Sequence, residues 1–370
     1  MRTGRWASVA NKKIGNQAHA AQGGMMKRFG KGGMIASAAM AMVALGVATT
    51  SFANNASAET YKWLTFKPQG AGDAQAISTQ WFVDEFKKRT NGEHEIEVFW
   101  GGSVAKTREI PDALSAGVGE FGDIVTPYFA DKFPLNNAVG FFIPQPNSTI
   151  EIAHLMEKWH AKYPQFSQEL ANYNLKAVGF RPLESYGLLC TSPIRSLADL
   201  KGKRIRTYGF AYPALVEALG ATPVSIATSE AYEALETSIL DCTPIGPALA
   251  YGWKYDEVAK YYIEIPLGAS FGHLIAMNLD TYNAMDDATR AVVDKLGQEY
   301  ADAYNDELEK TIKDVRAGWP AKGVEVIQFP KEELVSVIKD ERIQAVRQEW
   351  IARAEAAGLP AQEIVSELEF

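Results

Sequence analysis

From Tyr61 to Arg181 the chain alternates short apolar runs with longer stretches of helical periodicity, a pattern typical of α/β proteins. The short runs predict strands over residues 61–66, 95–100, 122–125 and 176–181. The periodic stretches predict helices over residues 76–90, 107–116 and 150–170, the first with an apolar stripe of Ile77, Trp81, Phe82 and Phe86. Because strands alternate with helices, we expect a parallel sheet with right-handed crossovers.

The same pattern starts again at Tyr186. It predicts strands over residues 187–191, 204–207, 221–225 and 239–243, and helices over residues 212–219 and 229–237. Gly220 is a suitable C-cap for the first of these helices, and Ser229 is a suitable N-cap for the second. Later segments predict strands over residues 273–278 and 324–329, a helix over residues 287–319 and a helical tail from Lys331. Two α/β units followed by long helices predict a bilobed protein with a ligand cleft between the lobes.

The amino terminus has the features of an export signal. Residues 1–58 hold seven of the 37 basic residues and none of the 45 acidic ones, so the net charge of the remainder is −15 rather than −8. Lys27, Arg28 and Lys31 precede a short apolar stretch rich in alanine, which ends at Ala56-Ser57-Ala58. This order predicts a secretory signal peptide cleaved after Ala58; an uncleaved membrane anchor would need a longer apolar run. We expect residues 59–370 to be periplasmic.

Charge and composition narrow the functional classes. The acidic balance argues against a nucleic-acid partner. The five histidines show no metal-ligand spacing, and we find no phosphate-binding, dinucleotide-binding or nucleophile-elbow motif, so we expect no metal, no cofactor and no catalytic residues. Two enzyme readings remain open: a hydrolase with an unrecognised site, and an isomerase that uses lysine and tyrosine.

The two cysteines, Cys190 and Cys242, lie on predicted strands of the second unit. An oxidising compartment permits a disulfide between them. The bond requires that the two strands pair in matching register, which sequence cannot establish. We therefore favour two free buried thiols.

One region carries an ordered series of matches to a known family. They are Asp199-Leu200-Lys201-Gly202, Arg206, Leu219-Gly220-Ala221-Thr222-Pro223, Ser229-Glu230, Tyr232, Ala234-Leu235, Asp241, Lys254, Glu257-Val258 and Lys260. On these residues the chain resembles the DctP-type substrate-binding subunits of tripartite ATP-independent periplasmic (TRAP) transporters. The resemblance extends over essentially all of residues 59–370.

The resemblance implies a periplasmic-binding-protein fold and a monomer without a cofactor. With the second start of the pattern at Tyr186, it divides the chain into lobe I, residues 59–184 plus 272–312, and lobe II, residues 185–271 plus 313–370. It implies a receptor that closes by hinge motion on an organic acid and delivers it to the small and large membrane subunits, for uptake driven by an ion gradient. An exported enzyme acting on a small organic acid and a ligand-sensing module remain alternatives.

Arg206 is the main candidate for binding the ligand. It stands at the carboxyl end of a predicted strand, where open α/β sheets place ligands, and it aligns with the family's carboxylate-binding arginine. A guanidinium offers a carboxylate two parallel hydrogen bonds and keeps its charge when buried. Arg204 lies on the same strand face, but its position is not that of the family's arginine.

Other candidates come from strand ends and from family positions. The aromatic candidates are Phe66, Trp100, Tyr128, Tyr186, Tyr208 and Phe271. Lys106 falls where the family often has a polar contact, and Thr243 lies in the turn after Asp241, where Ile245 replaces a family asparagine. Because Tyr128, Leu188 and Ile245 stand at family positions that are often polar, we expect an aromatic or aliphatic organic acid rather than a sugar acid.

Overall fold

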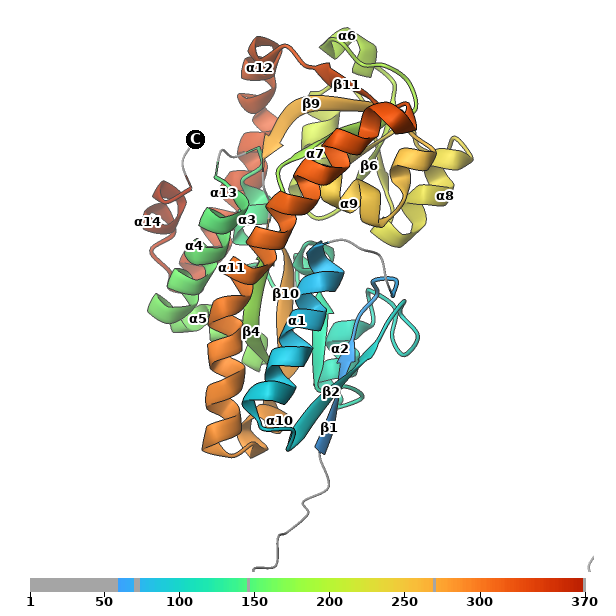
Figure 1. Ribbon diagram of the computed structural model, residues 1–370. Helices are drawn as coiled ribbons and strands as arrows, with labels where there is room; N and C mark the ends of the chain where they lie inside the picture. The colour runs from blue at the N-terminus through green and yellow to red at the C-terminus, as the bar shows by residue number, and fades with distance from the viewer. Residues whose placement is uncertain (1–58, 70–73, 145–146, 269–270, 369–370) are drawn as a thin grey trace, which may run out of the picture. The chain divides into compact units, whose positions relative to one another are not determined.

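The structure is a computed structural model that describes residues 59–69, 74–144, 147–268 and 271–368. The expected signal peptide and its cleavage site after Ala58 lie outside the described residues. Within the described ranges, the strands form one sheet of five and one of six (Figure 1). No helix in these ranges is both long enough and apolar enough to cross a bilayer.

The first sheet has the strand order β2-β1-β3-β10-β4. Its strands are β1 (Glu59–Leu64), β2 (His94–Phe99), β3 (Phe121–Ile124), β4 (Leu175–Pro182) and β10 (Phe271–Asn278). β1 runs parallel to β2 and β3, as predicted, but β10 is antiparallel to both β3 and β4. The expectation of a parallel sheet is wrong for β10, because a strand joins a parallel neighbour through a crossover connection and β10 instead follows β9 of the second sheet after only a short link.

The second sheet has the strand order β11-β9-β5-β8-β6-β7. Its strands are β5 (Tyr186–Cys190), β6 (Arg204–Thr207), β7 (Thr222–Ser225), β8 (Cys242–Ile245), β9 (Tyr261–Gly268) and β11 (Glu325–Gln328). β5 is antiparallel to β8 and β9, whereas β6 is parallel to β7 and β8. The sequence pattern missed β9 and began β8 three residues early, at Ile239.

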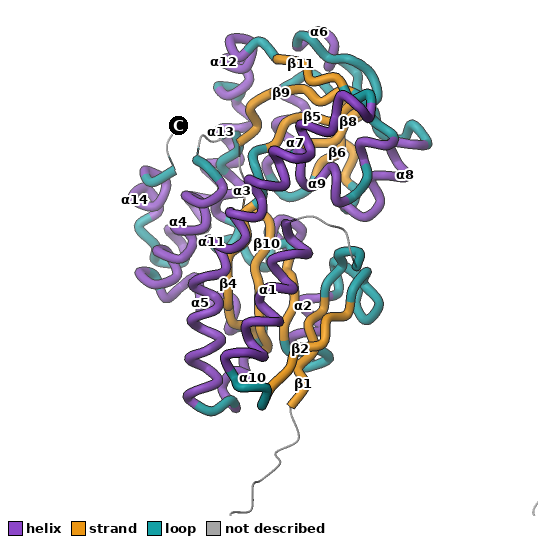
Figure 2. Tube along the Cα trace, in the orientation of Figure 1, coloured by secondary structure: helices purple, strands orange, loops and turns teal. Residues whose placement is uncertain are grey.

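Helices surround both sheets (Figure 2). They are α1 (Ala74–Arg89), α2 (Ile110–Ser115), α3 (Ala138–Phe141), α4 (Thr149–Lys162), α5 (Pro164–Ala171), α6 (Leu197–Leu200), α7 (Ala211–Ala218), α8 (Ala231–Glu236), α9 (Pro247–Gly252), α10 (Leu279–Ala284), α11 (Asp287–Gly318), α12 (Leu334–Ile338), α13 (Glu341–Ala356) and α14 (Ala361–Ser366). The helix predicted over residues 150–170 is interrupted at Tyr163, because Pro164 cannot continue it and begins α5 instead.

The apolar stripe predicted on α1 is only partly buried. Phe82 and Phe86 are fully buried and pack edge-on against Phe121 of β3. Ile77 is 40% exposed, because it lies near the start of α1 and faces a surface groove along α11. The helix is therefore held to its sheet mainly by its central turns.

The long helix α11 contacts β4 of the first sheet and α1, which follows β1 of that sheet. It also contacts α9, which follows β8 of the second sheet. The helix α13, which precedes the last helix α14, packs on α7 and on α3. There Trp350 lies edge-on to Phe142, and its indole nitrogen donates to the carbonyl of Pro134 at 3.1 Å. Residues 313–370 thus touch parts of both predicted lobes, and the lobe boundaries stay a prediction.

The expectation of free thiols is wrong, because Cys190 and Cys242 form a disulfide. The two residues are direct partners in the antiparallel pairing of β5 with β8, and their Cα atoms are 4.1 Å apart. The strand register therefore provides the proximity that the spacing of 52 residues along the chain could not show. The disulfide fastens the middle of the second sheet.

Candidate functional site

A pocket lies among residues of both sheets and their connections, and its empty space of about 330 Å³ is partly open to solvent. Five of the predicted site residues line it: Phe66, Tyr128, Tyr186, Arg206 and Tyr208. Phe66 follows β1, and Tyr128 belongs to the 3₁₀ helix η1 (Thr126–Phe129) after β3. Arg206 and Tyr208 lie at the end of β6. As expected for an α/β fold, the carboxyl ends of parallel strands supply these four residues, whereas Tyr186 begins the antiparallel strand β5.

Arg206 is the charged group of this cavity. Its side chain is buried, with 1% of the residue exposed, and it is held by neutral partners. Nε donates to the carbonyl of Ile226 at 3.1 Å, and Nη2 donates to the hydroxyls of Thr228 at 2.8 Å and Tyr128 at 3.1 Å. Among the described residues no carboxylate forms an ion pair with Arg206, and no protein atom accepts from its Nη1. The site therefore presents a positive charge without a matching anion.

The surroundings keep this guanidinium charged. Burial acts to lower the pKa of Arg206, but nearby phenol oxygens, Tyr128 foremost, act in the opposite direction, and the pKa is raised. Arg204, two residues earlier on the same strand, has a different environment. It forms a two-point ion pair with Asp241, with Nε and Nη2 each 3.0 Å from a carboxylate oxygen, and its side chain is 43% exposed. Of the two arginines, only Arg206 faces the cavity.

The Tyr128 hydroxyl links the two sides of the cavity. It accepts from the backbone N–H of Thr228 at 2.9 Å and from Arg206 Nη2 at 3.1 Å, and it lies 3.1 Å from the Thr228 hydroxyl. Tyr128 comes from the chain that leaves the first sheet, whereas Thr228 opens the 3₁₀ helix η2 (Thr228–Glu230) of the second. Tyr255 also donates to the carbonyl of Thr228. The bonds of Tyr128 connect the two sheets at the position of the candidate ligand.

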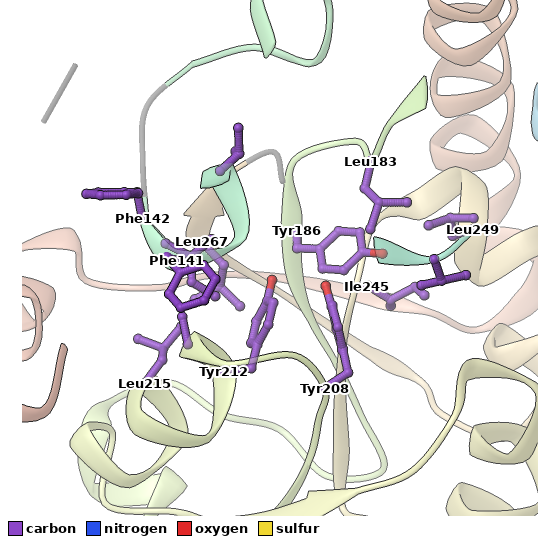
Figure 3. Packing of buried hydrophobic residues seen from close by; sticks show 14 of the residues in the cluster. Phe141, Phe142, Leu183, Tyr186, Tyr208, Tyr212, Leu215, Ile245, Leu249 and Leu267 are labelled. Carbon is purple, nitrogen blue, oxygen red and sulfur yellow. The ribbon is translucent and has the colours of Figure 1, made fainter. Parts of the chain in front are cut away.

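Aromatic rings form a wall beside Arg206. The Arg206 guanidinium carbon lies 4.8 Å from the ring centroid of Tyr208, and the rings of Tyr208 and Tyr212 are 4.6 Å apart. Figure 3 shows the hydroxyls of Tyr208 and Tyr212 on the side that faces Tyr186. Burial raises the pKa of Tyr186 and of Tyr212 well above the usual value, so both phenols are neutral at physiological pH.

A second polar group set lies at another part of the same cavity. Gln75, in the first turn of α1, and His273, on β10, both line it. His273 Nδ1 accepts from Arg181 Nη2 at 3.0 Å, and Arg181 Nη2 lies 3.1 Å from a carboxylate oxygen of the fully buried Asp123. Burial, and then the charges of Arg181 and Lys67, hold the pKa of His273 well below its usual value. The imidazole is therefore neutral.

Comparison with known proteins identifies the family. The model of the bacterial extracellular solute-binding proteins, family 7, matches residues 68–352. This chain belongs to that family. The family 7 match includes every strand of both sheets except β1.

Similar proteins agree with this family 7 assignment. The ectoine-binding periplasmic protein TeaA of Halomonas elongata is 24% identical over 325 residues, which cover 85% of this chain and 88% of TeaA. A solved TRAP solute-binding protein from Bordetella bronchiseptica, with bound (R)- and (S)-mandelate, has a TM-score of 0.74 at 18% identity and covers 84% of this chain and 97% of its own. A solved TRAP solute-binding protein from an unidentified marine microbe, with co-purified pyroglutamate, has a TM-score of 0.72 at 21% identity and covers 84% and 98%. The predicted α/β periplasmic-binding-protein fold is confirmed.

Four residues predicted for the site of this family 7 protein are not among the described lining residues. Trp100 is half-buried after β2, and Lys106 is exposed, with its backbone N–H bonded to Glu109. Thr243 is fully buried inside β8, where it pairs with Leu189 of β5. Phe271 begins β10, but its side chain lies outside the described residues.

Sequence reasoning in turn missed several residues that line the cavity. They are Gln75, Val125, Leu183, Thr228, Leu249 and His273. One signal was available: Gln75 is a polar residue in the first helical turn after a predicted strand, which is where α/β proteins place ligand contacts. Nothing local singles out His273, because β10 reaches the site only through its long-range pairing with β3 and β4.

Proposed function

We propose that this chain is the periplasmic receptor of a TRAP transporter, which captures a small organic acid and delivers it to the membrane subunits. The observation that carries the proposal is Arg206, a buried cation without a carboxylate partner among the described residues, in a cavity enclosed by both sheets. An isolated buried charge is costly, and an anionic ligand relieves that cost. The ligands named for the relatives, ectoine, mandelate and pyroglutamate, each carry a carboxylate.

In this proposal the ligand carboxylate lies against Arg206 Nη1, the guanidinium nitrogen for which the described part of the chain provides no acceptor. Tyr208 packs on the guanidinium and holds it in place. Phe66 and Tyr186 form apolar surface around the rest of the ligand. Trp100, Lys106 and Thr243 have no role in this arrangement.

Delivery requires that the cavity opens. The Tyr128 hydroxyl joins the two sheets through Thr228 and Arg206, so separating the sheets at this point breaks these bonds and exposes Arg206 to water. We propose hinge motion between lobe I, residues 59–184 plus 272–312, and lobe II, residues 185–271 plus 313–370. Residues 1–58 direct export and are removed after Ala58. The receptor acts as a monomer and does not convert its ligand.

The experiment begins with protein exported to the periplasm of a bacterial host. Intact-mass analysis reports the amino terminus, which we expect at Glu59. Native mass spectrometry followed by denaturing extraction identifies the retained molecule, which we expect to be an organic acid recovered unchanged. A retained molecule without an acidic group contradicts the proposal, and so does its conversion during incubation with the protein.

Titration calorimetry with that acid then tests Arg206. Losing one partner of a desolvated charged pair costs about 3–5 kcal/mol, so Arg206→Ala should weaken binding at least about 100-fold. Arg206→Lys should recover little, because an ammonium lacks the planar pair of donors. Arg204→Ala is the matched control: it removes an arginine from the same strand that pairs with Asp241 outside the cavity, and its affinity should stay near wild type. Equal losses in the two alanine variants would place the carboxylate elsewhere.

A further inference from the structure

The side-chain amide of Gln75 is buried without a partner. Gln75 is 2% exposed and lines the cavity, and neither its Nε2 nor its Oε1 forms a hydrogen bond within the described part of the chain. Its backbone is well fixed, since its carbonyl accepts from the hydroxyl of Thr79 at 2.9 Å in the first turn of α1. Protein interiors seldom leave a carboxamide unpaired, because each unmade bond is costly. Gln75 Nε2 and Oε1 therefore offer a ligand in the cavity one hydrogen-bond donor group and one acceptor.

His273 adds a second donor to the same cavity. An arginine only donates, so the bond from Arg181 Nη2 to His273 Nδ1 makes Nδ1 the acceptor of the neutral ring and leaves the proton on Nε2. Among the described residues no atom accepts from His273 Nε2. The charge of Arg181 is balanced by Asp123, 3.1 Å away. This end of the cavity thus offers neutral hydrogen-bonding groups.

The charges of the described lining residues favour a ligand with one carboxylate. Arg206 is the only cavity-lining side chain, among those described, that carries a charge while His273 is neutral. The nearby Lys67 ammonium lies over the Trp253 ring, 4.8 Å from its centroid, and is not among the lining residues. A second carboxylate would meet a neutral amide and a neutral imidazole, and it has no hydrogen to donate to Gln75 Oε1.

We propose that the ligand is a small monocarboxylate that also carries a cis amide, as in a lactam. This inference rests on the proposed receptor function and names the ligand class. The ligand carboxylate binds Arg206, and its amide carbonyl accepts from Gln75 Nε2 and from His273 Nε2. Its amide N–H donates to Gln75 Oε1. A carboxamide and a cis amide present donor and acceptor side by side in opposite order, so they form two parallel hydrogen bonds.

The test compares three acids by calorimetry on the exported protein freed of ligand. Pyroglutamate has a five-membered lactam and one carboxylate, cyclopentanecarboxylate has the same ring size without the amide, and glutarate has two carboxylates. Unpaired buried polar groups cost affinity, so we expect pyroglutamate to bind about 10- to 100-fold more tightly than cyclopentanecarboxylate and more tightly than glutarate. Equal or tighter binding of either comparison acid, or no binding of pyroglutamate, overturns the inference without any variant.

Variants on α1 then assign the preference to Gln75. Gln75→Met keeps the length of the side chain but removes the amide, and it should abolish the preference for pyroglutamate over cyclopentanecarboxylate. Gln80→Met is the matched control, since Gln80 lies on the same helix, is exposed and donates to Asp84. It should keep the full preference. An equal loss of affinity for both acids in Gln75→Met also overturns the inference.

Failure of this inference is distinguishable from failure of the receptor function. If cyclopentanecarboxylate or glutarate binds, depends on Arg206 and outcompetes pyroglutamate, the ligand class is wrong and the receptor function stands. If the exported protein retains no organic acid and Arg206→Ala changes the affinity for none of the three acids, both proposals fail.

Discussion

Tyr128→Phe is the perturbation that best separates ligand contact from closure of the site. The change removes one oxygen and keeps the ring, which lies edge-on to Tyr208 at 6.3 Å and 4.5 Å from the Arg108 guanidinium carbon. In the closed structure the lost hydroxyl leaves the Thr228 N–H without its acceptor and removes one of two hydroxyls bonded to Arg206 Nη2. In an open state water replaces the hydroxyl for both groups. The penalty therefore falls on the closed state.

The magnitude follows from these bonds. A neutral hydrogen bond contributes about 1 kcal/mol and one to a charged group about 1.5–3 kcal/mol. Arg206 Nη2 keeps its 2.8 Å bond to Thr228, so the lower part of the range applies to it. Together the two losses come to about 2.5 kcal/mol, which raises Kd about 70-fold. Because encounter with the open state is unchanged, the loss should appear in the dissociation rate.

Calorimetry and stopped-flow binding with the co-purified acid measure the two quantities. Tyr232→Phe is the control, since this change on α8 removes only a 3.5 Å hydrogen bond to Glu257, which is exposed to solvent. It should bind as wild type does. A Tyr128→Phe Kd within about threefold of wild type, or a loss confined to the association rate, would refute the reasoning that Tyr128 stabilises the closed state.

Three further predictions concern stability. The disulfide closes a loop of 52 residues, so the double variant Cys190→Ala/Cys242→Ala should lose roughly 4 kcal/mol of unfolding free energy in urea, and unfolded unreduced wild-type protein should react with no thiol label. Burial lowers the pKa of His160 to about 3, so the unfolded chain binds a proton below pH 6.5 that the folded chain excludes. The free energy of unfolding should therefore decrease as the pH is lowered from 7 to 5, by about 2 kcal/mol more in wild type than in His160→Gln. Equal decreases would show that His160 does not contribute. On α11, a Cβ at Gly297 would lie 1.9 Å from the carbonyl oxygen of Val178, whereas one at Gly318 meets nothing within 4 Å. Gly297→Ala should cost about 1–3 kcal/mol and Gly318→Ala should gain about 0.5–1 kcal/mol in thermal unfolding, and the same sign for both would contradict the packing of α11 on β4.

Much of the fold could be read from local pattern. β6 matches its predicted range of residues 204–207, and α11 ends one residue before the predicted boundary at Trp319. Alternating hydrophobicity and turn residues decide such elements through near neighbours in the chain. The family resemblance over residues 199–260 likewise indicates Arg206 as a ligand contact. Arg206 also lies at the end of a strand, which is where an α/β sheet places its ligand.

Pairing between distant strands was beyond that pattern. Cys190 meets Cys242 because β5 runs antiparallel to β8, and nothing near either residue indicates that direction. β10 enters the first sheet antiparallel for a similar reason: it arrives directly from the second sheet instead of through a crossover helix.

By itself, the sequence determined the class of the fold, the order of most elements and the arginine that faces the cavity. The tertiary structure alone decided which groups stand around that arginine. Tyr128 and Thr228 are 100 residues apart yet share a hydrogen bond. Gln75 lies on α1, directly after the first strand of the first sheet, and His273 lies on β10, the last strand of that sheet in chain order. Convergence of this kind depends on register and crossing between sheets, which are global properties of packing, whereas the sequence pattern reports only which face of each element is apolar.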